Sequence, residues 1–303
     1  MADLRLLSSP WLVRLAPWLF VLLWSTGFIS AKYGLPYSEP FTFLSWRMGL
    51  NLLCFALLLK VFAVSLPRSW RLWRQQLLAG SLIHGAYLGG VFSAIDAGIP
   101  AGLTALLVGL QPLLTGFLVY LFWQQKLGLR QWGGLVLGLV GVLLVLQQTA
   151  DMQLESVSIT WQGLLWVLLA LLGITLGTLY QKQACDPQPL LATSFMQYSA
   201  TFVLVLLGAG LRGEGAVEWH PDFILALGWS VLVLSVGALL LLLMMIKAGE
   251  ATRTASYFYL APPLTALEAW LLFDERMTGL ALAGMLLTVL GVYWANRSTR
   301  TER

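Results

Sequence analysis

Two charged side chains of this sequence, Arg47 and Glu268, fall inside long apolar stretches. A charge in hydrocarbon is costly unless it is paired or hydrated, so such residues serve a binding site, a proton path or an internal ion pair. The planar guanidinium of Arg47 suits two-point contact with a carboxylate, which could belong to a substrate or to Glu268. A buried carboxyl group such as that of Glu268 can carry a proton, or it can pair with Arg47 or Lys32. Both roles stay open for each residue.

Polar and aromatic side chains lie in other apolar stretches. His84 and Tyr87 stand one helical turn apart and could bind a polar group of a solute or bond to a neighbouring helix. Trp24 lies too deep for the tryptophan belt of a membrane interface and could stack on an aromatic or cationic solute. We therefore expect a solute near the middle of the membrane, among Trp24, Thr26, His84, Tyr87, Gln111, Tyr257 and Tyr259.

The chain matches itself without a gap when it is shifted by 150 residues. Pro112-Leu113-Leu114-Thr115 falls on Pro262-Pro263-Leu264-Thr265, and Gly141-Val142 falls on Gly291-Val292. The same shift places Gln197 at the position of Arg47. The same shift aligns residues along the whole length of each half of the chain, which indicates a tandem duplication. We expect a first copy over residues 1–150 and a second copy over residues 151–303.

Prolines interrupt the apolar segments at matching places of the two copies, at Pro112, Pro262 and Pro263. A proline inside a helix removes a backbone hydrogen bond and frees a carbonyl group. Paired helix breaks near the middle of the membrane are the best sequence pointer to the binding site of a transporter. A kink that only serves packing is the alternative.

Composition predicts that most of the surface faces hydrocarbon. Hydrophobic residues make up 58% of the chain and charged residues 11%, with a mean hydropathy of +0.79, whereas soluble proteins carry about 25% charged residues. An apolar segment of about 20 residues crosses a bilayer. The expected fold is an all-α integral membrane protein with ten transmembrane helices, at about 16–34, 40–60, 76–97, 101–123, 131–148, 161–181, 190–210, 223–246, 252–273 and 279–296.

Five crossings per copy is an odd number, so the second copy enters the membrane from the opposite side. Two inverted five-helix repeats are typical of secondary transporters, because exchanging the conformations of the halves opens the site to the other side. With a cytoplasmic N-terminus, fourteen Lys and Arg residues lie inside and three outside, as the positive-inside rule requires. We therefore expect both termini in the cytoplasm. Contact with anionic lipid accounts for the basic residues without a nucleic-acid partner.

The sequence lacks the patterns typical of enzymes and metalloproteins. It has no Gly-x-x-x-x-Gly-Lys-Ser/Thr loop, no His-Glu-x-x-His pair and no Gly-x-Ser-x-Gly turn. The two cysteines and two histidines are too scattered to suggest a metal site. We expect no catalytic residue, no metal and no cofactor, and hence a protein that is not an enzyme.

Short motifs are distributed over residues 16–297, namely Trp24-Ser25-Thr26-Gly27-Phe28 with Lys32, Phe43 to Arg47, Leu110-Gln111-Pro112, Leu260-Ala261-Pro262 and Asp274-Glu275. In these motifs the chain resembles the EamA branch of the drug/metabolite transporter superfamily. The resemblance implies export of small metabolites such as amino acids, through a cavity lined by segments one, three, four, six, eight and nine. Segment two is not a main wall in that family, which favours an internal role for Arg47. One departure is Gln124-Gln125, where relatives often carry an acid.

The leading expectation is a secondary exporter of small amphipathic metabolites, with amino acids or related compounds first, working by alternating access across the bacterial inner membrane. The solute and membrane lipid are the expected partners, and protons are a candidate coupling ion. Other classes stay open, namely a lipid- or nucleotide-sugar-handling carrier, an intramembrane enzyme and a channel. A channel filter would need a ring of polar or charged residues, and none is evident. The substrate, the coupling ion and the choice between a monomer and a homodimer stay undecided.

Overall fold

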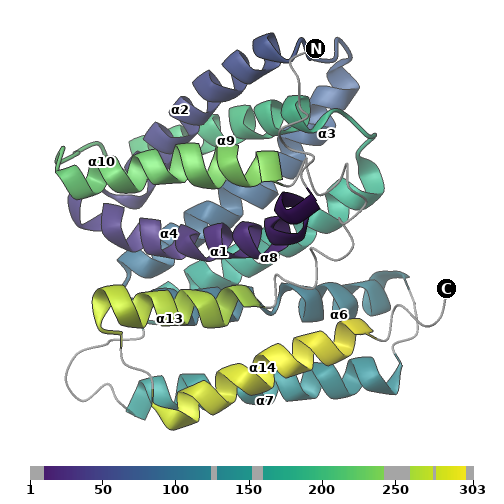
Figure 1. Ribbon diagram of the computed structural model, residues 1–303, viewed down its shortest axis with the longest axis vertical. Helices are drawn as coiled ribbons and strands as arrows, with labels where there is room; N and C mark the ends of the chain where they lie inside the picture. The colour runs from purple at the N-terminus through teal and green to yellow at the C-terminus, as the bar shows by residue number, and fades with distance from the viewer. Residues whose placement is uncertain (1–9, 124–127, 152–159, 242–259, 276–277, 298–303) are drawn as a thin grey trace.

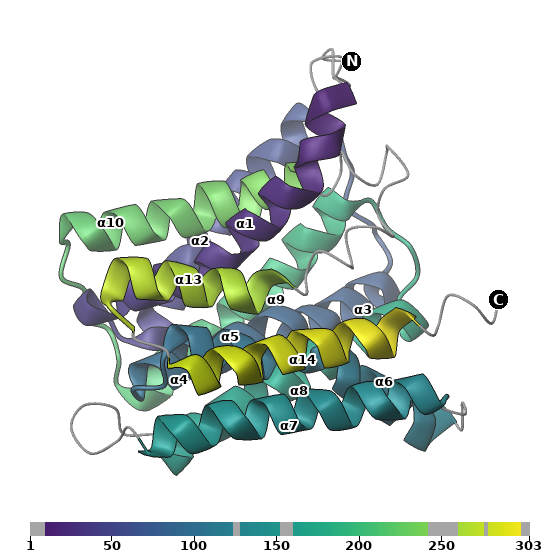
Figure 2. The ribbon, with the colours of Figure 1, turned by 60° about the horizontal axis from the view of Figure 1, so that its bottom comes forward.

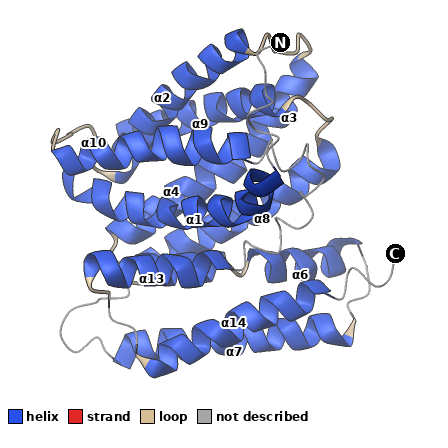
Figure 3. Ribbon diagram, in the orientation of Figure 1, coloured by secondary structure: helices blue, strands red, loops and turns tan. Residues whose placement is uncertain are grey.

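The computed structural model describes residues 10–123, 128–151, 160–241, 260–275 and 278–297. Within these ranges the chain is helical, and an isolated bridge between Ser38 and Val217 is the only extended pairing (Figure 3). Hydrocarbon offers no water to satisfy backbone amides, so a segment that crosses it must bond to itself. This is why the apolar segments of the sequence become helices.

Proline and glycine mark several helix ends. Pro40 and Pro221 stand at the starts of α2 and α10, and Gly213 follows α9 in a left-handed conformation with a φ of 71°. The bounds of the described elements are α1 Pro10–Gly34, η2 Leu35–Tyr37, α2 Pro40–Val61, α3 Trp70–Gly80, η3 Ser81–Ala86, α4 Tyr87–Asp96, α5 Ala101–Val108, α6 Gln111–Trp123, α7 Leu129–Asp151, α8 Trp161–Ala184, α9 Leu190–Arg212, α10 Pro221–Gly228, η5 Trp229–Gly237, α13 Ala261–Phe273 and α14 Gly279–Arg297.

The described helices confirm the expected membrane architecture. Two of them, Leu129–Val145 and Gly279–Trp294, are apolar but shorter than a full crossing, and α13 starts where the described residues resume. This arrangement agrees with ten crossings in two repeats. Among the described residues, seven helical stretches are long and apolar enough to cross a membrane, at Leu15–Tyr37, Pro40–Val61, Trp70–Asp96, Ala101–Phe122, Trp161–Ala184, Leu190–Arg212 and Pro221–Leu241.

The last helix of each copy, α7 in the first and α14 in the second, pack side by side (Figures 1 and 2). A Cβ atom added to Gly141 would lie 2.4 Å from the carbonyl oxygen of Gly284. A Cβ atom added to Gly291 would lie 2.6 Å from the carbonyl oxygen of Gly134. The shift of 150 residues converts one contact into the other with the copies exchanged. The seam between α7 and α14 therefore lies on a two-fold pseudo-symmetry axis.

The predicted helix break of the first copy occurs beside Pro112. Segment 101–123 divides into α5 and α6 just before Pro112, and Pro262 and Pro263 lie in the first turn of α13. The residues before α13 lie outside the described ranges. A Cβ atom added to Gly109, between α5 and α6, would lie 2.8 Å from Cγ of Pro262. The break of the first copy thus lies directly against the proline of the second.

Two π-helical segments, η3 and η5, occupy matching places in the third helix of each copy. The shift of 150 residues places 81–86 on 231–236, within η5. A π-turn takes more residues than an α-turn, so it redirects the side chains that follow, and such turns are frequent at functional sites. The sequence predicted regular helix for both segments. The difference matters because η3 carries His84 and η5 carries Ser235.

Glycines allow the helices around the centre to approach closely. A Cβ atom added to Gly80, at the end of α3, would lie 2.5 Å from both Cα and the carbonyl oxygen of Gln197 on α9. One added to Gly90 on α4 would lie 2.5 Å from the carbonyl oxygen of Trp166 on α8. Small residues at such crossings are typical of helix packing in membranes. They bring α3, η3 and α4 against α8 and α9.

Candidate functional site

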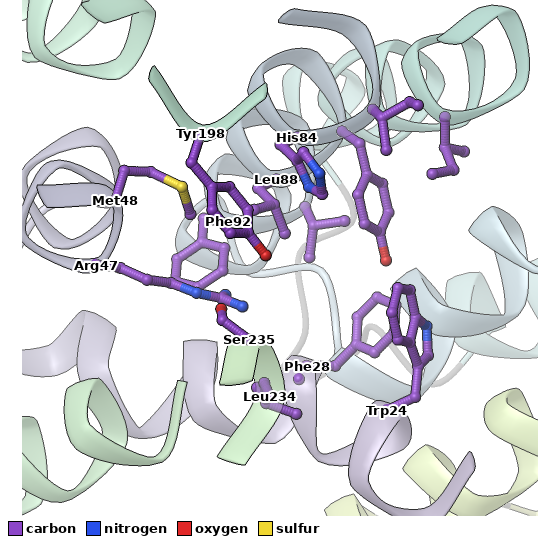
Figure 4. A pocket seen from close by; sticks show the side chains of 15 residues that line it. Trp24, Phe28, Arg47, Met48, His84, Leu88, Phe92, Tyr198, Leu234 and Ser235 are labelled. Atoms are coloured by element: carbon purple, nitrogen blue, oxygen red, sulfur yellow. The ribbon is translucent and has the colours of Figure 1, made fainter. Parts of the chain in front are cut away.

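A cavity of about 90 Å³ lies among α1, α2, η3, α4, α8, α9 and η5 (Figure 4). Its walls are mainly apolar with a few polar side chains, which is the usual make-up of a small-molecule site. Four residues singled out in the sequence line it, namely Trp24, Arg47, His84 and Tyr87. The structure therefore brings together side chains from the first, second and third helices of the first copy.

Arg47 on α2 supplies the permanent charge of the described cavity wall. It is 7% exposed, and its guanidinium points into the cavity near Ser235 (Figure 4). Its Nε atom has no hydrogen-bond partner, and none of the ion pairs among the described residues includes it. Segment two therefore does supply a cavity wall, contrary to the expectation. The arrangement leaves the Arg47 cation directed at the cavity space.

Glu268 on α13 contacts α1, and it does not pair with Arg47 or Lys32. The Ser25 hydroxyl oxygen lies 2.7 Å from Glu268 Oε1 and 2.8 Å from the carbonyl oxygen of Leu22. Glu268 Oε2 is buried without a hydrogen-bond partner. Ser25 can donate to an ionised Glu268, or it can donate to Leu22 and accept from a protonated Glu268. This geometry suits both protonation states of the carboxyl group, which lies outside the cavity lining.

Lys32 finds its partner at the end of α13 instead. Lys32 Nζ forms an ion pair with Glu275 Oε1 and lies 4.6 Å above the ring of Phe273. Glu275 also accepts hydrogen bonds from the first amides of α5, those of Ala101 at 3.3 Å and Gly102 at 3.5 Å. One carboxylate thus ties together the ends of α1 and α13 and the start of α5.

A second tie lies at the same end of the bundle, between the α1–α2 and α9–α10 connections. The Glu218 amide donates to the carbonyl oxygen of Tyr37 at 2.9 Å, and the Tyr37 ring stacks on His220 at 4.4 Å. Glu214 accepts from the amides of Phe41 at 2.8 Å and Thr42 at 3.2 Å, which caps the start of α2. These contacts hold the two copies together at the end of the bundle where α2, the helix that carries Arg47, begins.

His84 is held by polar groups behind the cavity wall. Its Nε2 atom lies 3.2 Å from Gln197 Oε1, and Gln197 Nε2 donates to Gln76 Oε1 at 2.9 Å. The imidazole therefore donates from Nε2 to the Gln197 amide oxygen in this arrangement. Gln197 is the residue that the 150-residue shift places on Arg47. The two copies thus use equivalent positions differently, one for a charge in the cavity and one to orient His84.

Other predicted site residues lie elsewhere. The Thr26 hydroxyl accepts a hydrogen bond from Trp229 Nε1 at 2.8 Å, and Gln111 Nε2 donates to Thr178 Oγ1 at 3.2 Å. Neither residue lines the cavity, and each links two helices instead. Tyr257 and Tyr259 fall outside the described residues. The structure therefore does not bring Thr26 and Gln111 into the lining of this cavity.

Sequence reasoning missed part of the cavity wall, namely Phe28, Met48, Phe92, Tyr198, Leu234 and Ser235. Tyr198 could have been found, because it follows Gln197, the equivalent of Arg47. Ser235 accepts from Asn51 Nδ2 at 3.0 Å and donates to the carbonyl oxygen of Ser230 at 3.0 Å. Its place depends on the π-helical turn of η5, which the sequence pattern does not reveal.

In the part of the chain that the structure describes, no group of three or more His, Cys, Asp or Glu side chains could hold a metal ion. The polar groups of the cavity are instead hydroxyls, the imidazole of His84 and the guanidinium of Arg47. Such groups can bind and orient a solute.

Comparisons with known proteins agree with this architecture. The chain matches the EamA-like transporter family over residues 15–147 and 161–297. The Bacillus subtilis protein named "Uncharacterized transporter YvbV" is 25% identical over 287 residues, which cover 93% of this chain and 91% of that protein. The Salmonella typhimurium protein named "Probable amino-acid metabolite efflux pump" is 27% identical over 303 residues, which cover 94% of this chain and 96% of that protein.

A solved crystal structure shares the fold, with a TM-score of 0.64 and 19% identity over 97% of this chain and 100% of the other. The relatives carry the names of transporters and efflux pumps, not of enzymes. The apolar helices and the family match together make this a multi-pass membrane transporter. Because that match spans both copies and most of the chain, the chain belongs to the EamA-like transporter family.

Proposed function

We propose that this protein is a secondary exporter of small amphipathic carboxylates, with amino acids and their derivatives as the first candidates. Arg47 is the observation that carries the proposal. It is a buried cation that faces the cavity without an acidic partner among the described residues. A charge inside a membrane protein requires an opposite charge or water, and a guanidinium fits a carboxylate through two parallel hydrogen bonds.

The rest of the cavity suits an apolar body. Trp24 and Phe28 lie on the side of the cavity away from Arg47 (Figure 4), and their rings offer a large apolar surface to a solute. A ligand with a carboxylate at one end and an aromatic or branched chain at the other would satisfy both sides. The printed name of the Salmonella relative, an amino-acid metabolite efflux pump, agrees with this class.

We propose alternating access as the mechanism, in the bacterial inner membrane with both termini in the cytoplasm. In that orientation α1 and α13 end on the outer side. The Lys32–Glu275 pair and the tie between the 34–40 and 213–220 connections would then close the outer end of the bundle. Repeats related by a pseudo-two-fold axis allow the opposite closure by exchange of their conformations.

Topology is the first expected result. Reporter fusions should place both termini and the 61–75 connection in the cytoplasm, and the 149–160 and 211–222 connections outside. The reason is the excess of Lys and Arg on one side. Activity of a cytoplasmic reporter fused within 211–222 would contradict both the orientation and the inverted arrangement of the copies.

Glu268 is the proposed proton carrier, because the Ser25 hydroxyl can serve either of its protonation states. Glu268→Gln keeps the size and the hydrogen bonding of the side chain but removes titration. We expect this variant to lose uphill export driven by a proton gradient and to keep solute counterflow, which needs no proton. Both rates are measured in proteoliposomes with an imposed pH gradient.

Ser25→Ala is the matched control for Glu268→Gln. It removes the hydroxyl but leaves a titratable carboxyl group, so uphill export should persist with a shifted pH dependence. If Glu268→Gln exports uphill at the normal rate, Glu268 is structural and coupling must come from another group.

Flux through purified protein in proteoliposomes tests the function itself. The probes are radiolabelled L-phenylalanine and L-leucine with their N-acetyl and 2-oxo analogues. Saturable counterflow of at least one probe is the expected result. Flux without saturation would indicate a channel, and a covalently altered probe would indicate an enzyme. Absence of flux for every probe would reject small amphipathic carboxylates as the substrates.

A further inference from the structure

The described wall of the cavity contains cationic and neutral groups but no acid. Arg47 and His84 line it, and no Asp or Glu does. The chain has 14 acidic residues, of which two, Asp96 and Glu268, lie inside predicted membrane segments. Asp96 is exposed at the end of α4, and Glu268 is bonded to Ser25 outside the cavity.

The remaining acids fall at chain ends or in connections. Glu250, which lies outside the described residues, belongs by sequence to the break between the segments 223–246 and 252–273. An acid at the end of a crossing lies at the membrane surface, whereas Arg47 lies inside the predicted segment 40–60. Among the described residues that line it, the cavity thus has an anion receptor, Arg47, and no acidic receptor for a cation.

From this imbalance we infer that the site selects carboxylates whose neighbouring nitrogen is uncharged or absent. N-acylated amino acids and 2-oxo acids with aromatic or branched apolar side chains are the substrate class, and free amino acids are disfavoured. The inference rests on the proposed function, because it requires Arg47 to bind the substrate carboxylate.

Geometry fixes where the nitrogen must lie. In an α-amino acid the ammonium is bonded to the carbon beside the carboxylate, so a carboxylate on Arg47 holds the ammonium near Arg47 as well. Trp24, which could attract a cation through its ring face, lies on the opposite side of the cavity (Figure 4). The ammonium would therefore lie nearer to the guanidinium, which repels it, than to the ring of Trp24.

The groups around Arg47 give an ammonium little compensation for its lost hydration. Met48 offers a thioether, the Ser235 hydroxyl is already engaged with Asn51 and Ser230, and the Tyr198 hydroxyl could accept one hydrogen bond but carries no charge. A buried charge that lacks both an opposite charge and a full set of hydrogen bonds is strongly disfavoured. An acyl or keto oxygen carries no such cost, and it can accept a hydrogen bond from Tyr198, whose hydroxyl points into this end of the cavity (Figure 4).

Matched ligands test the inference on the full-length purified protein. Binding of N-acetyl-L-phenylalanine, phenylpyruvate, L-phenylalanine and N-acetyl-L-phenylalanine amide is measured by calorimetry and by competition in proteoliposome counterflow. We expect the first two to bind at least about tenfold more tightly than L-phenylalanine. The amide lacks the carboxylate and should bind at least about tenfold more weakly than its parent acid.

The outcomes separate this inference from the proposed function. If L-phenylalanine binds as tightly as its N-acetyl and 2-oxo analogues, the selection against an ammonium is wrong, and the proposed exporter of carboxylates stands. If the amide binds as well as N-acetyl-L-phenylalanine, or if no carboxylate binds, Arg47 does not bind a carboxylate and both proposals fail. Arg71→Ala, which removes an exposed arginine paired with Asp186, should change none of the four affinities.

Discussion

Replacement of Arg47 by alanine is expected to weaken solute binding strongly without lowering the yield of folded protein. The guanidinium is the charge that we propose for the substrate carboxylate, and loss of one partner of a buried charge pair costs about 2–5 kcal/mol. The affinity should therefore fall by about 30-fold to more than 1000-fold. Binding is measured by calorimetry, and the yield of monodisperse protein by size-exclusion chromatography.

The yield separates this role from an internal ion pair. Breaking a buried pair costs about 3–5 kcal/mol, because the partner is left uncompensated, and the yield of folded protein would fall. No described acid pairs with Arg47, so we expect no such loss. Arg47→Lys keeps the charge but loses the planar fork, and it should recover only part of the affinity. Normal yield together with normal binding in Arg47→Ala would reject both roles.

Gly80→Val is expected to prevent accumulation of folded protein. The added Cβ atom would lie 2.5 Å from Cα and from the carbonyl oxygen of Gln197, and both are backbone atoms of α9 that cannot rotate away. Overpacking of this kind costs about 3 kcal/mol. It also pushes η3 from α9, where Gln197 orients His84. The measurement is the fraction of protein that elutes as a folded species and its thermal midpoint.

Gly210→Val is the matched control, because Gly210 lies on α9, the helix that Gly80 approaches, with nothing within 4 Å of its added Cβ atom. This variant makes the same chemical change in a membrane helix without a clash. We expect its yield and its thermal midpoint to match those of the unchanged protein. If both variants lose yield and thermal stability equally, glycine is needed at these positions for a reason other than the close approach of α3 and α9.

The fold could be predicted from the sequence because hydrocarbon leaves an apolar segment little choice but a helix. The shift of 150 residues then divided the ten crossings into five per copy, and Pro112 indicated the break between α5 and α6. The π-helical turns could not be predicted in this way. A single inserted residue hardly changes the hydrophobic pattern of η3 or η5, yet it decides which side chains face the cavity.

The site could be predicted only in part. Trp24, Arg47, His84 and Tyr87 were found because a polar or aromatic side chain is unexpected at mid-membrane. Thr26 has the same character, but its hydroxyl bonds to Trp229 on another helix, and residue type alone does not reveal which helix face meets the cavity.

Pairings across the bundle are beyond sequence reasoning for a related reason. Lys32 and Glu275 are 243 residues apart, so their contact depends on how α1 and α13 end relative to each other. The sequence offered Glu268 as a partner for Arg47 or Lys32, and the assembled helices place Glu268 against Ser25 instead. The charge of a side chain and its depth in the membrane can be inferred from its position in the sequence. The neighbours that it meets depend on which face of the helix it occupies, and that must come from the structure.

The seam between α7 and α14 bears on how such a chain can arise. Each copy contributes one glycine-lined face, and Gly141 meets Gly284 as Gly291 meets Gly134. The two faces are equivalent but run in opposite directions, so a five-helix ancestor could form this seam only if half of its molecules inserted upside down. Fusion of the two copies gives every molecule one of each orientation. Assembly then no longer depends on the chance meeting of oppositely inserted chains.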